Sequence, residues 1–361
     1  MKSAKKHIHA PFLRSFAFLL AFLLLFTSCE WSSFVSPMED AAAIPSGTVT
    51  GSGTGQTEAP NTQPNIPIFY NRYTGLACDE AISSCRPLSV CVGNFDGKEQ
   101  EGLSFAEILI EAPVDGDATR LWAITTNWSS ISSIKNISPI KSYMVPMVHA
   151  FGSIAAYAGT SGSITSAFDA IDYASGEFTE NFSADGSLVT SSGNIHLNAA
   201  IKKNYNMQDS LCALPYRLCD VDAPYSPIGN RISSLHFAYS AKNTVDFAYD
   251  AASNTYLKSS SGAAHTDPLT GTQLSFSNVI ILFYNVSYYH TANGTSFTLD
   301  TTVGGSGFCY TGGGVVPIKW GYDSVGTLVF ANENGEPLTI NRGKTYIGML
   351  KITDSTSVVA R

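Results

Sequence analysis

The part of the chain that begins near Arg231 most constrains the fold, because its apolar residues alternate with polar ones over short stretches. Alternation with a period of two predicts half-buried β-strands. Turn-forming pairs such as Asn293-Gly294 and Asn334-Gly335 separate the stretches, and no helical period interrupts them. We therefore expect a predominantly antiparallel β domain over residues 231–361. Its strands are predicted at residues 235–239, 245–249, 278–284, 296–303, 315–320 and 344–350.

The stretch from Glu101 to Thr126 predicts a helix, an acidic turn and a strand. Ser104 and Glu107 have the spacing of a capping box, which predicts a short helix beginning at Phe105. Pro113 disfavours helical geometry in the residue before it and should end this helix. A strand is then expected at residues 119–126, which are rich in β-branched and aromatic side chains.

A second helix is predicted over residues 139–151. Ser138 suits the N-cap, Pro139 suits the first helical position, and the apolar residues that follow have helical spacing. Pro146 should kink this helix. With strands expected at 86–92 and 154–158 and a further helix at 163–173, residues 68–230 are predicted to form an α/β domain. The fold class is thus α+β, an N-terminal α/β domain followed by the β domain.

The N-terminus has the features of an export signal. Positive residues precede an apolar run from Phe16 to Phe26, which is too short to span a bilayer. Thr27-Ser28-Cys29 follows and resembles the bacterial lipobox, with Phe26 where leucine is usual. We expect residues 1–29 to be a lipoprotein signal peptide ending in a lipidated Cys29; the alternative is an ordinary signal peptide that contains a cysteine. Residues 30–67 are rich in Ser, Thr, Gly and Pro, which predicts a flexible tether.

Charge and motif content exclude several classes of function. Only 14% of the 361 residues are charged and the net charge is −8, which excludes a nucleic-acid-binding protein because such proteins need a basic surface. The sequence lacks a nucleophile elbow, an HExxH motif, a phosphate-binding loop and zinc-ligand spacing. No cofactor and no metal are expected, and the chain is not identified as an enzyme.

The cysteines after Cys29 leave the disulfide pattern open. There are six of them, at positions 78, 85, 91, 212, 219 and 309. Cys78 and Cys85, Cys212 and Cys219, or Cys91 and Cys309 are suitable pairs in an exported chain, and free buried thiols are an equal alternative. Six cysteines allow fifteen pairings, so the sequence does not decide between them.

A set of motifs extends from Arg86 to the C-terminus. In the first half they are Gly102-Leu103, Ala106-Glu107-Ile108, Glu111, Asp115-Gly116 and Thr119-Arg120; in the second they are Tyr249, Tyr256, Gly262, His265, Asp267, Asn278-Val279, Gly305-Ser306-Gly307, Trp320 and Gly343-Lys344-Thr345. With these motifs the chain resembles the YerB-like bacterial lipoproteins, a family defined by a two-part domain of unknown function.

The chain departs from that family at two motifs. Relatives have Gly-Pro-Val-Arg-Ser-Ala-Arg where this chain has residues 138–144, so that Lys141 and Met144 stand in place of arginines. Lysine lacks the planar fork that holds an oxyanion at two points. Relatives also have Pro-His-Asn where this chain has His196-Leu197-Asn198. If these residues bind a ligand in the family, we expect this chain to bind that ligand differently or not at all.

Three clusters are candidates for binding or catalysis. The first combines Arg120 with Glu111 and Asp115 at a strand end, and its structural alternative is an ion pair that fixes the turn. The second is the helix start with Lys141 and Ser142, where backbone N–H groups suit an anion; the alternative is an ordinary capped helix. The third combines His196 with His265 and Asp267, which could bind a metal or act as acid–base groups, and structural histidines are the alternative. Asn198 is a further candidate binding residue beside His196.

Two classes of function remain. The first is a non-catalytic binding or assembly factor, anchored to the bacterial cell membrane through Cys29 on its extracytoplasmic face, with a cell-wall polymer or an envelope protein as partner. The alternative is an envelope hydrolase or transferase that acts on a phosphate-bearing or glycan substrate.

Overall fold

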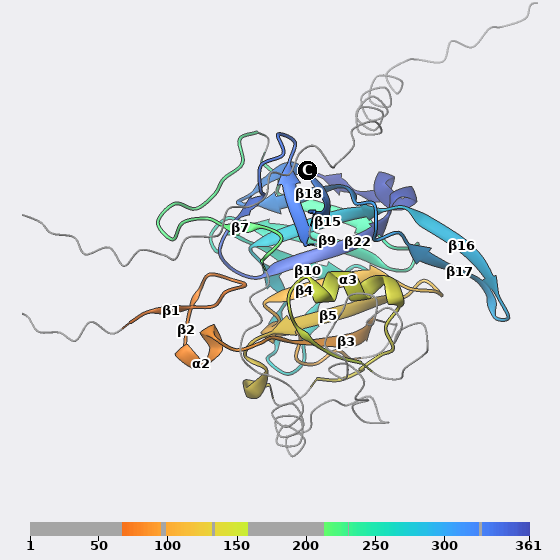
Figure 1. The fold of residues 1–361 in the computed structure, drawn as a ribbon, viewed down its shortest axis with the longest axis horizontal. Helices are drawn as coiled ribbons and strands as arrows, with labels where there is room; N and C mark the ends of the chain where they lie inside the picture. Colours follow the sequence, from red (N-terminus) through yellow and green to blue (C-terminus); the bar gives the residue numbers. More distant parts are fainter. Residues whose placement is uncertain (1–66, 95–98, 132–133, 158–212, 230, 325–326) are drawn as a thin grey trace, which may run out of the picture. The chain divides into compact units, whose positions relative to one another are not determined.

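The computed structural model describes residues 67–94, 99–131, 134–157, 213–229, 231–324 and 327–361, which all belong to one compact unit that extends from Glu39 to Arg361 (Figure 1). The predicted signal peptide with Cys29, the predicted tether and the predicted helix at 163–173 lie outside the described residues, as do His196, Asn198 and Cys212.

A nine-stranded mixed sheet forms the centre of the unit, in the order β20-β19-β18-β15-β22-β4-β5-β3-β6. Its strands are β3 (Leu88–Asn94), β4 (Ile108–Pro113), β5 (Thr119–Thr125), β6 (Ile154–Ala156), β15 (Asn278–Tyr284), β18 (Gly305–Thr311), β19 (Gly314–Tyr322), β20 (Leu328–Asn332) and β22 (Thr345–Lys351). The N-terminal and C-terminal halves meet where β22 pairs in parallel with β4, with Thr345 opposite Ile108. The large sheet therefore joins strands from both sides of residue 230.

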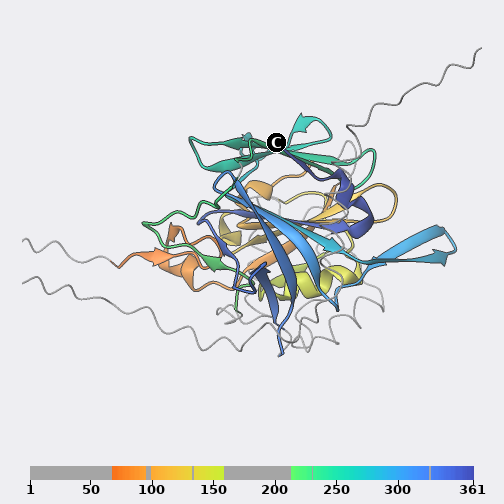
Figure 2. The same ribbon diagram turned by 90° about the horizontal axis from the view of Figure 1, so that it is seen from above.

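A smaller antiparallel sheet covers one face of the large sheet (Figure 2). Its strands are β8 (Ser234–Ala238), β9 (Thr244–Asp250), β10 (Thr255–Ser260), β11 (Ala263–Ala264), β14 (Ser275–Phe276) and β23 (Val359–Ala360). Phe237 and Phe247 of the small sheet are buried in one cluster with Leu109 and Leu121 of the large sheet. The inward residues of β9 and β10 alternate with outward ones, as the sequence pattern predicted for this half.

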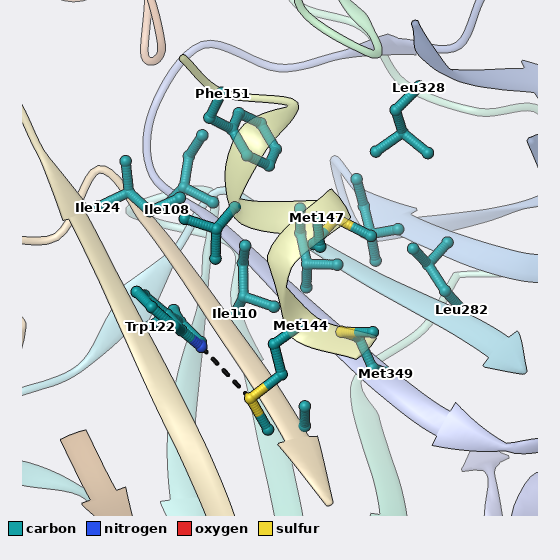
Figure 3. Packing of buried hydrophobic residues seen from close by; sticks show 14 of the residues in the cluster. Ile108, Ile110, Trp122, Ile124, Met144, Met147, Phe151, Leu282, Leu328 and Met349 are labelled. Carbon is teal, nitrogen blue, oxygen red and sulfur yellow. Dashed lines mark hydrogen bonds between the residues drawn. The ribbon is translucent and has the colours of Figure 1, made fainter. Parts of the chain in front are cut away.

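The opposite face of the large sheet packs against a short helical segment. The segment consists of η4 (Ser142–Met144) and α3 (Val145–His149). Met144 and Met147 of this segment lie among Ile108, Ile110 and Trp122 of the sheet, as Figure 3 shows. The large sheet is therefore buried on both faces.

The remaining elements are short. They are β1 (Phe69–Tyr70), β2 (Ala77–Cys78), α2 (Glu80–Ser83), η2 (Leu103–Phe105), η3 (Trp128–Ser130), β7 (Arg217–Leu218), β12 (Thr266–Asp267), β13 (Thr272–Gln273), β16 (Val286–Thr291), β17 (Gly294–Leu299), β21 (Thr339–Ile340) and η5 (Ile352–Ser357). The described chain is thus mostly β, in several sheets, and the predicted N-terminal α/β domain is not confirmed. Within the described residues no helix is long and apolar enough to cross a membrane.

The prediction of a helix from Phe105 was wrong. Ser104 donates its hydroxyl to Asp267, and Glu107 accepts from the Thr126 N–H, so neither makes the reciprocal capping contact. A 3₁₀ turn ends at Phe105, and Ile108 begins β4, every residue of which is buried. A continuous apolar run suits a strand that is covered on both faces, and this environment overrides the local capping signal.

The second helix begins later than predicted. Ser138 is not its N-cap, because its N–H donates to the carbonyl of Cys91 and its hydroxyl donates to that of Asn136. The helical residues begin at Ser142, and Pro146 lies in the first turn of α3, where the missing N–H costs no helical hydrogen bond. Pro146 therefore starts a helix instead of kinking one.

The five cysteines within the described residues are free thiols: Cys78, Cys85, Cys91, Cys219 and Cys309. The pairings of Cys78 with Cys85 and of Cys91 with Cys309 are therefore not present. Burial raises the pKa of the Cys91 thiol to about 12, so this thiol is protonated and packs as an apolar side chain.

Candidate functional site

A pocket of about 600 Å³ opens between the small sheet and the ends of β3–β5. We call it the inter-sheet pocket. The turn between β4 and β5 and the turn between β8 and β9 form two of its walls. Gly116 and Asp117 adopt positive φ values of 80° and 62°, which make the first turn tight. The lining residues are Asn94, Glu99, Gln100, Gly116, Asp117, Ala118, Lys242, Asn243, Ser260, Ser261, Ala263, Ala264, His265, Thr266 and Pro268.

A fully buried ion pair lies between the sheets next to this pocket. Lys258 Nζ is 3.4 Å from Glu111 Oε2, and both side chains are 0% exposed. Lys258 points inward because β10 alternates, so that it shares the inner face with Tyr256. Glu111 also accepts hydrogen bonds from the hydroxyls of Thr119, at 2.7 Å, and Tyr346, at 2.8 Å. These bonds offset the cost of desolvating the carboxylate.

Three side chains, those of His265, Gln100 and Asn94, connect this pair to the pocket and form with it a closed ring of polar contacts. Lys258 Nζ is 3.1 Å from His265 Nδ1, and His265 Nε2 is 2.6 Å from Gln100 Oε1. Gln100 Nε2 donates to Asn94 Oδ1 at 2.7 Å, and Asn94 Nδ2 donates to Glu111 Oε1 at 3.0 Å. The ion pair between Glu111 and Lys258 closes the ring.

The two charged groups fix the direction of every bond in the ring. An ammonium group can only donate and a carboxylate can only accept. His265 Nδ1 therefore accepts from Lys258, which places the imidazole proton on Nε2, where it is donated to Gln100. Burial, and then the charge of Lys258, hold the pKa of His265 well below its usual value. The imidazole is therefore neutral, as this arrangement requires.

Two tyrosines complete the buried polar layer. The Tyr239 hydroxyl lies 3.1 Å from that of Tyr346 and donates to the Glu111 carbonyl at 3.0 Å. Burial, and then the charge of Glu111, raise the pKa of both tyrosines well above the usual value. Both hydroxyls therefore keep their protons and act as donors.

One polar atom at the pocket has no hydrogen-bond partner in the described part of the chain. Asn243 lines the pocket and is 7% exposed; its Nδ2 donates to Thr119 Oγ1 at 3.3 Å, but its Oδ1 accepts no hydrogen bond. A buried carbonyl oxygen without a donor costs about 1–3 kcal/mol, so such groups call for an explanation.

The predicted cluster of Glu111, Asp115 and Arg120 is not one site. Glu111 faces the small sheet, whereas Arg120 points to the opposite face, where its Nε donates to the Pro139 carbonyl at 3.2 Å. Asp115 pairs with Lys141 at 2.6 Å and accepts from the Ser296 hydroxyl. Partial burial raises the pKa of Asp115, but the hydrogen bonds from Lys141 and Ser296 outweigh it and lower the pKa below its usual value.

The predicted anion site at Lys141 and Ser142 lies at the start of the short helical segment η4–α3, but its lysine is paired with a carboxylate. Lys141 directs its ammonium group to Asp115, and the 3₁₀ segment that begins at Ser142 has three residues. Met144 is buried in the apolar cluster, where Trp122 Nε1 lies 3.4 Å from its sulfur (Figure 3). Sulfur is a weak acceptor, so this contact partly satisfies the indole N–H.

His265 and Asp267 are close in sequence but act separately. Asp267 is 1% exposed; its Oδ1 accepts from the Gly102 N–H at 3.0 Å, and its Oδ2 accepts from the Ser104 N–H at 2.8 Å. Its role is to hold the turn before β4. No group of three or more His, Cys, Asp or Glu side chains among the described residues is arranged to hold a metal ion.

Lys258, Gln100, Asn94 and Asn243 were missed by sequence reasoning. The sequence contained one signal for Lys258. Side chains of a strand point alternately to its two faces, so residue 258 lies on the same inner face as Tyr256. The three amide side chains carry no comparable signal, since nothing in their local sequence marks them as buried or as partners of Glu111, His265 or Thr119.

Comparison with known proteins supports the same fold over most of the chain. Residues 73–209 match the N-terminal domain of the protein family of unknown function DUF3048, and residues 235–347 match its C-terminal domain. A protein of Bacillus subtilis (strain 168), provisionally named lipoprotein YerB, is 25% identical over 301 residues, which cover 79% of this chain and 87% of the relative.

A solved structure shows the same architecture. The crystal structure of the YerB protein from Bacillus subtilis superimposes with a TM-score of 0.65 at 24% identity, and the match covers 81% of this chain and 99% of that one. Together, the two family matches and the relative account for both halves of the large sheet. The chain belongs to the YerB-like family, whose members combine the N-terminal and C-terminal DUF3048 domains.

Proposed function

We propose that this protein is a lipid-anchored, extracytoplasmic protein of the bacterial cell envelope that binds a neutral polar ligand in the inter-sheet pocket without altering it. The lipobox-like sequence before Cys29 and the provisional name of its Bacillus relative support the anchor. The chemistry of the pocket supports the binding role.

The unpartnered Oδ1 of Asn243 carries the proposal. A ligand O–H or N–H group at this position would supply the missing donor, and rearrangement of the turn at Asn243 on binding would expose the oxygen to it. The other polar groups of the lining are mainly amides and hydroxyls, which suit the hydroxyl and acetamido groups of a wall glycan. Lys242 is outnumbered by Glu99 and Asp117, so the lining does not favour an anion.

The ring argues for binding rather than catalysis. A general base needs a free lone pair within reach of its substrate. His265 uses Nδ1 to accept from Lys258 and Nε2 to donate to Gln100, so neither nitrogen is available. Lys258 and Glu111 are fully buried. The ring therefore positions the pocket wall.

Calorimetric titration of the full-length chain with soluble oligomers of N-acetylglucosamine, which are neutral and carry hydroxyl and acetamido groups, tests the proposal. We expect saturable binding that weakens at least tenfold in Asn243→Leu, and chromatography should recover the glycan unchanged. Asn285→Leu is the matched control, because Asn285 is exposed between β15 and β16 and should bind like wild type. Absence of binding, or an equal effect of both substitutions, contradicts the proposal.

A second candidate is an envelope hydrolase or transferase acting on a glycan or phosphate-bearing substrate. The observation that favours it is a neutral imidazole beside a buried ammonium at the edge of a pocket. It requires that the ring open on substrate binding. Cleavage of the glycan by wild-type protein, lost in His265→Gln at unchanged affinity, would establish this function in place of the first.

A further inference from the structure

The hairpin of β16 and β17 projects away from the two packed sheets, as Figures 1 and 2 show from two directions. It forms a two-stranded sheet of its own, with Val286 opposite Leu299 at its base and Thr291 opposite Gly294 at its tip. Within the described residues, β16 therefore pairs with β17 on one side only. Its outer edge carries backbone N–H and C=O groups that can pair with another strand.

This edge lacks the usual protection against strand pairing. Natural proteins protect exposed edges with lysine, proline or bulges. The sequence of β16 is Val-Ser-Tyr-Tyr-His-Thr, which contains no proline, glycine, lysine or acid and has high β-propensity. Tyr288 is 59% exposed and Tyr289 is 46% exposed. An uncharged strand of this composition is suited to adding a further strand.

The hairpin is fixed to the body through the middle of β17. Phe297 of β17 stacks on Tyr143 with ring centroids 6.1 Å apart, and Lys351 Nζ lies 4.5 Å from the centre of the same ring. Ser296 donates its hydroxyl to Asp115 at 2.8 Å. The strand is thus held in an extended conformation, which lowers the entropy cost of pairing it with a partner.

We propose that the partner of β16 is the β16 strand of a second copy of this chain. Strand addition requires a polypeptide backbone, which excludes a glycan as the occupant of this edge. Two identical strands meet without repulsion between fixed like charges only when they contain none, and β16 contains no Lys, Arg, Asp or Glu. Antiparallel pairing about a two-fold axis at position 288 forms a closed contact in which Tyr288 of one copy lies directly opposite Tyr288 of the other.

The contact is small and should be weak in free solution. A pair of six-residue strands buries less than the roughly 1,200 Å² typical of stable interfaces. The inference rests here on the proposed lipid anchor, because confinement of both copies to one membrane would raise their effective concentration and compensate for the small area. The dimer is therefore expected on a membrane.

Energy transfer between copies on a membrane tests the proposal. Full-length chains labelled with a donor or an acceptor dye are reconstituted together in phosphatidylcholine vesicles. Wild-type chains should show transfer above that of a random distribution at the same density. Tyr288→Lys and Tyr288→Glu should each abolish this excess when present alone, because like charges then face each other at the centre of the paired strands.

An equal mixture of the two charged variants should restore the excess, since opposite charges then meet across the pair. Val303→Lys is the control for an added charge, because Val303 is 63% exposed and outside the hairpin; it should behave like wild type. The proposal is overturned if wild-type chains show no more energy transfer than a random distribution. It is also overturned if either single variant keeps the excess transfer, or if the mixture does not restore it. None of these outcomes involves the inter-sheet pocket.

Discussion

Lys258 Nζ lies 3.4 Å from Glu111 Oε2, and both side chains are fully buried. Each buried charge is therefore stabilised by the opposite charge of its partner. Removal of one member leaves an uncompensated buried charge, and such changes typically cost about 3–5 kcal/mol. We expect Glu111→Gln and Lys258→Met each to lower the free energy of unfolding by about this amount. Urea denaturation followed by fluorescence measures the change.

The double variant Glu111→Gln/Lys258→Met supplies the control for this prediction. Without either charge, the desolvation penalty disappears, so its loss of stability should be clearly smaller than the sum of the two single losses. Simple additivity would show that the two groups do not depend on each other.

The stability of the fold should decrease as the pH falls below about 6.5 because of His265. Burial and Lys258 lower its pKa in the folded state, whereas the unfolded residue takes up a proton near pH 6.5. Between the two pKa values the unfolded state binds more protons, so acidification favours unfolding, by at most about 1.4 kcal/mol per pH unit.

The matched variant His265→Gln isolates this effect. The pKa of His149 is also lowered, first by burial and then by Arg86, and it adds the same dependence to both proteins. We therefore compare the free energies of unfolding of wild type and His265→Gln from pH 8 to pH 5. As the pH falls below about 6.5, wild type should lose stability relative to His265→Gln. A difference that is independent of pH contradicts the prediction.

The β-rich character of the C-terminal half was predictable from short runs, several of them alternating, that are separated by turn residues, although β10 and β16 were not among the predicted strands. Strand β5 was predicted to begin at Thr119 from its content of β-branched and aromatic residues, and the structure begins it there. The short stretch from Ser104 to Pro113 misled the prediction, because its capping signal is local while the pairing of β4 with β22 depends on residues more than two hundred positions away. Tertiary pairing decides such a segment.

The site was less predictable than the fold. Glu111 and His265 were identified as candidates, but their connection runs through Lys258, and Gln100 and Asn94 close the ring. A ring of this kind depends on how the two sheets are packed against each other, and a single sequence carries no record of that packing.

Met144 should tolerate an apolar replacement but not the arginine of its relatives. Its side chain is 1% exposed in the apolar cluster under Trp122. Met144→Leu conserves volume and should cost less than about 1.5 kcal/mol. Met144→Arg places a charge in this cluster without a carboxylate partner and should cost several times more. Thermal unfolding of the two variants checks the ratio, and equal midpoints would contradict the burial argument.

Asp267 should be irreplaceable even by its amide. Its two oxygens together accept from the N–H groups of Gly102, Ser104 and Leu269 and from the Ser104 hydroxyl. Asparagine has one acceptor oxygen, and its NH₂ group would face N–H or O–H donors on the other side. We therefore expect Asp267→Asn to destabilise the fold nearly as much as Asp267→Ala, by about 2–4 kcal/mol.

Hydrogen exchange at Gly102 and Ser104 should accelerate in both variants, because these amides lose their acceptor. Asp250→Asn, at the end of β9, should leave exchange at Gly102 and Ser104 unchanged, and a similar acceleration there would show that the effect is not specific to Asp267.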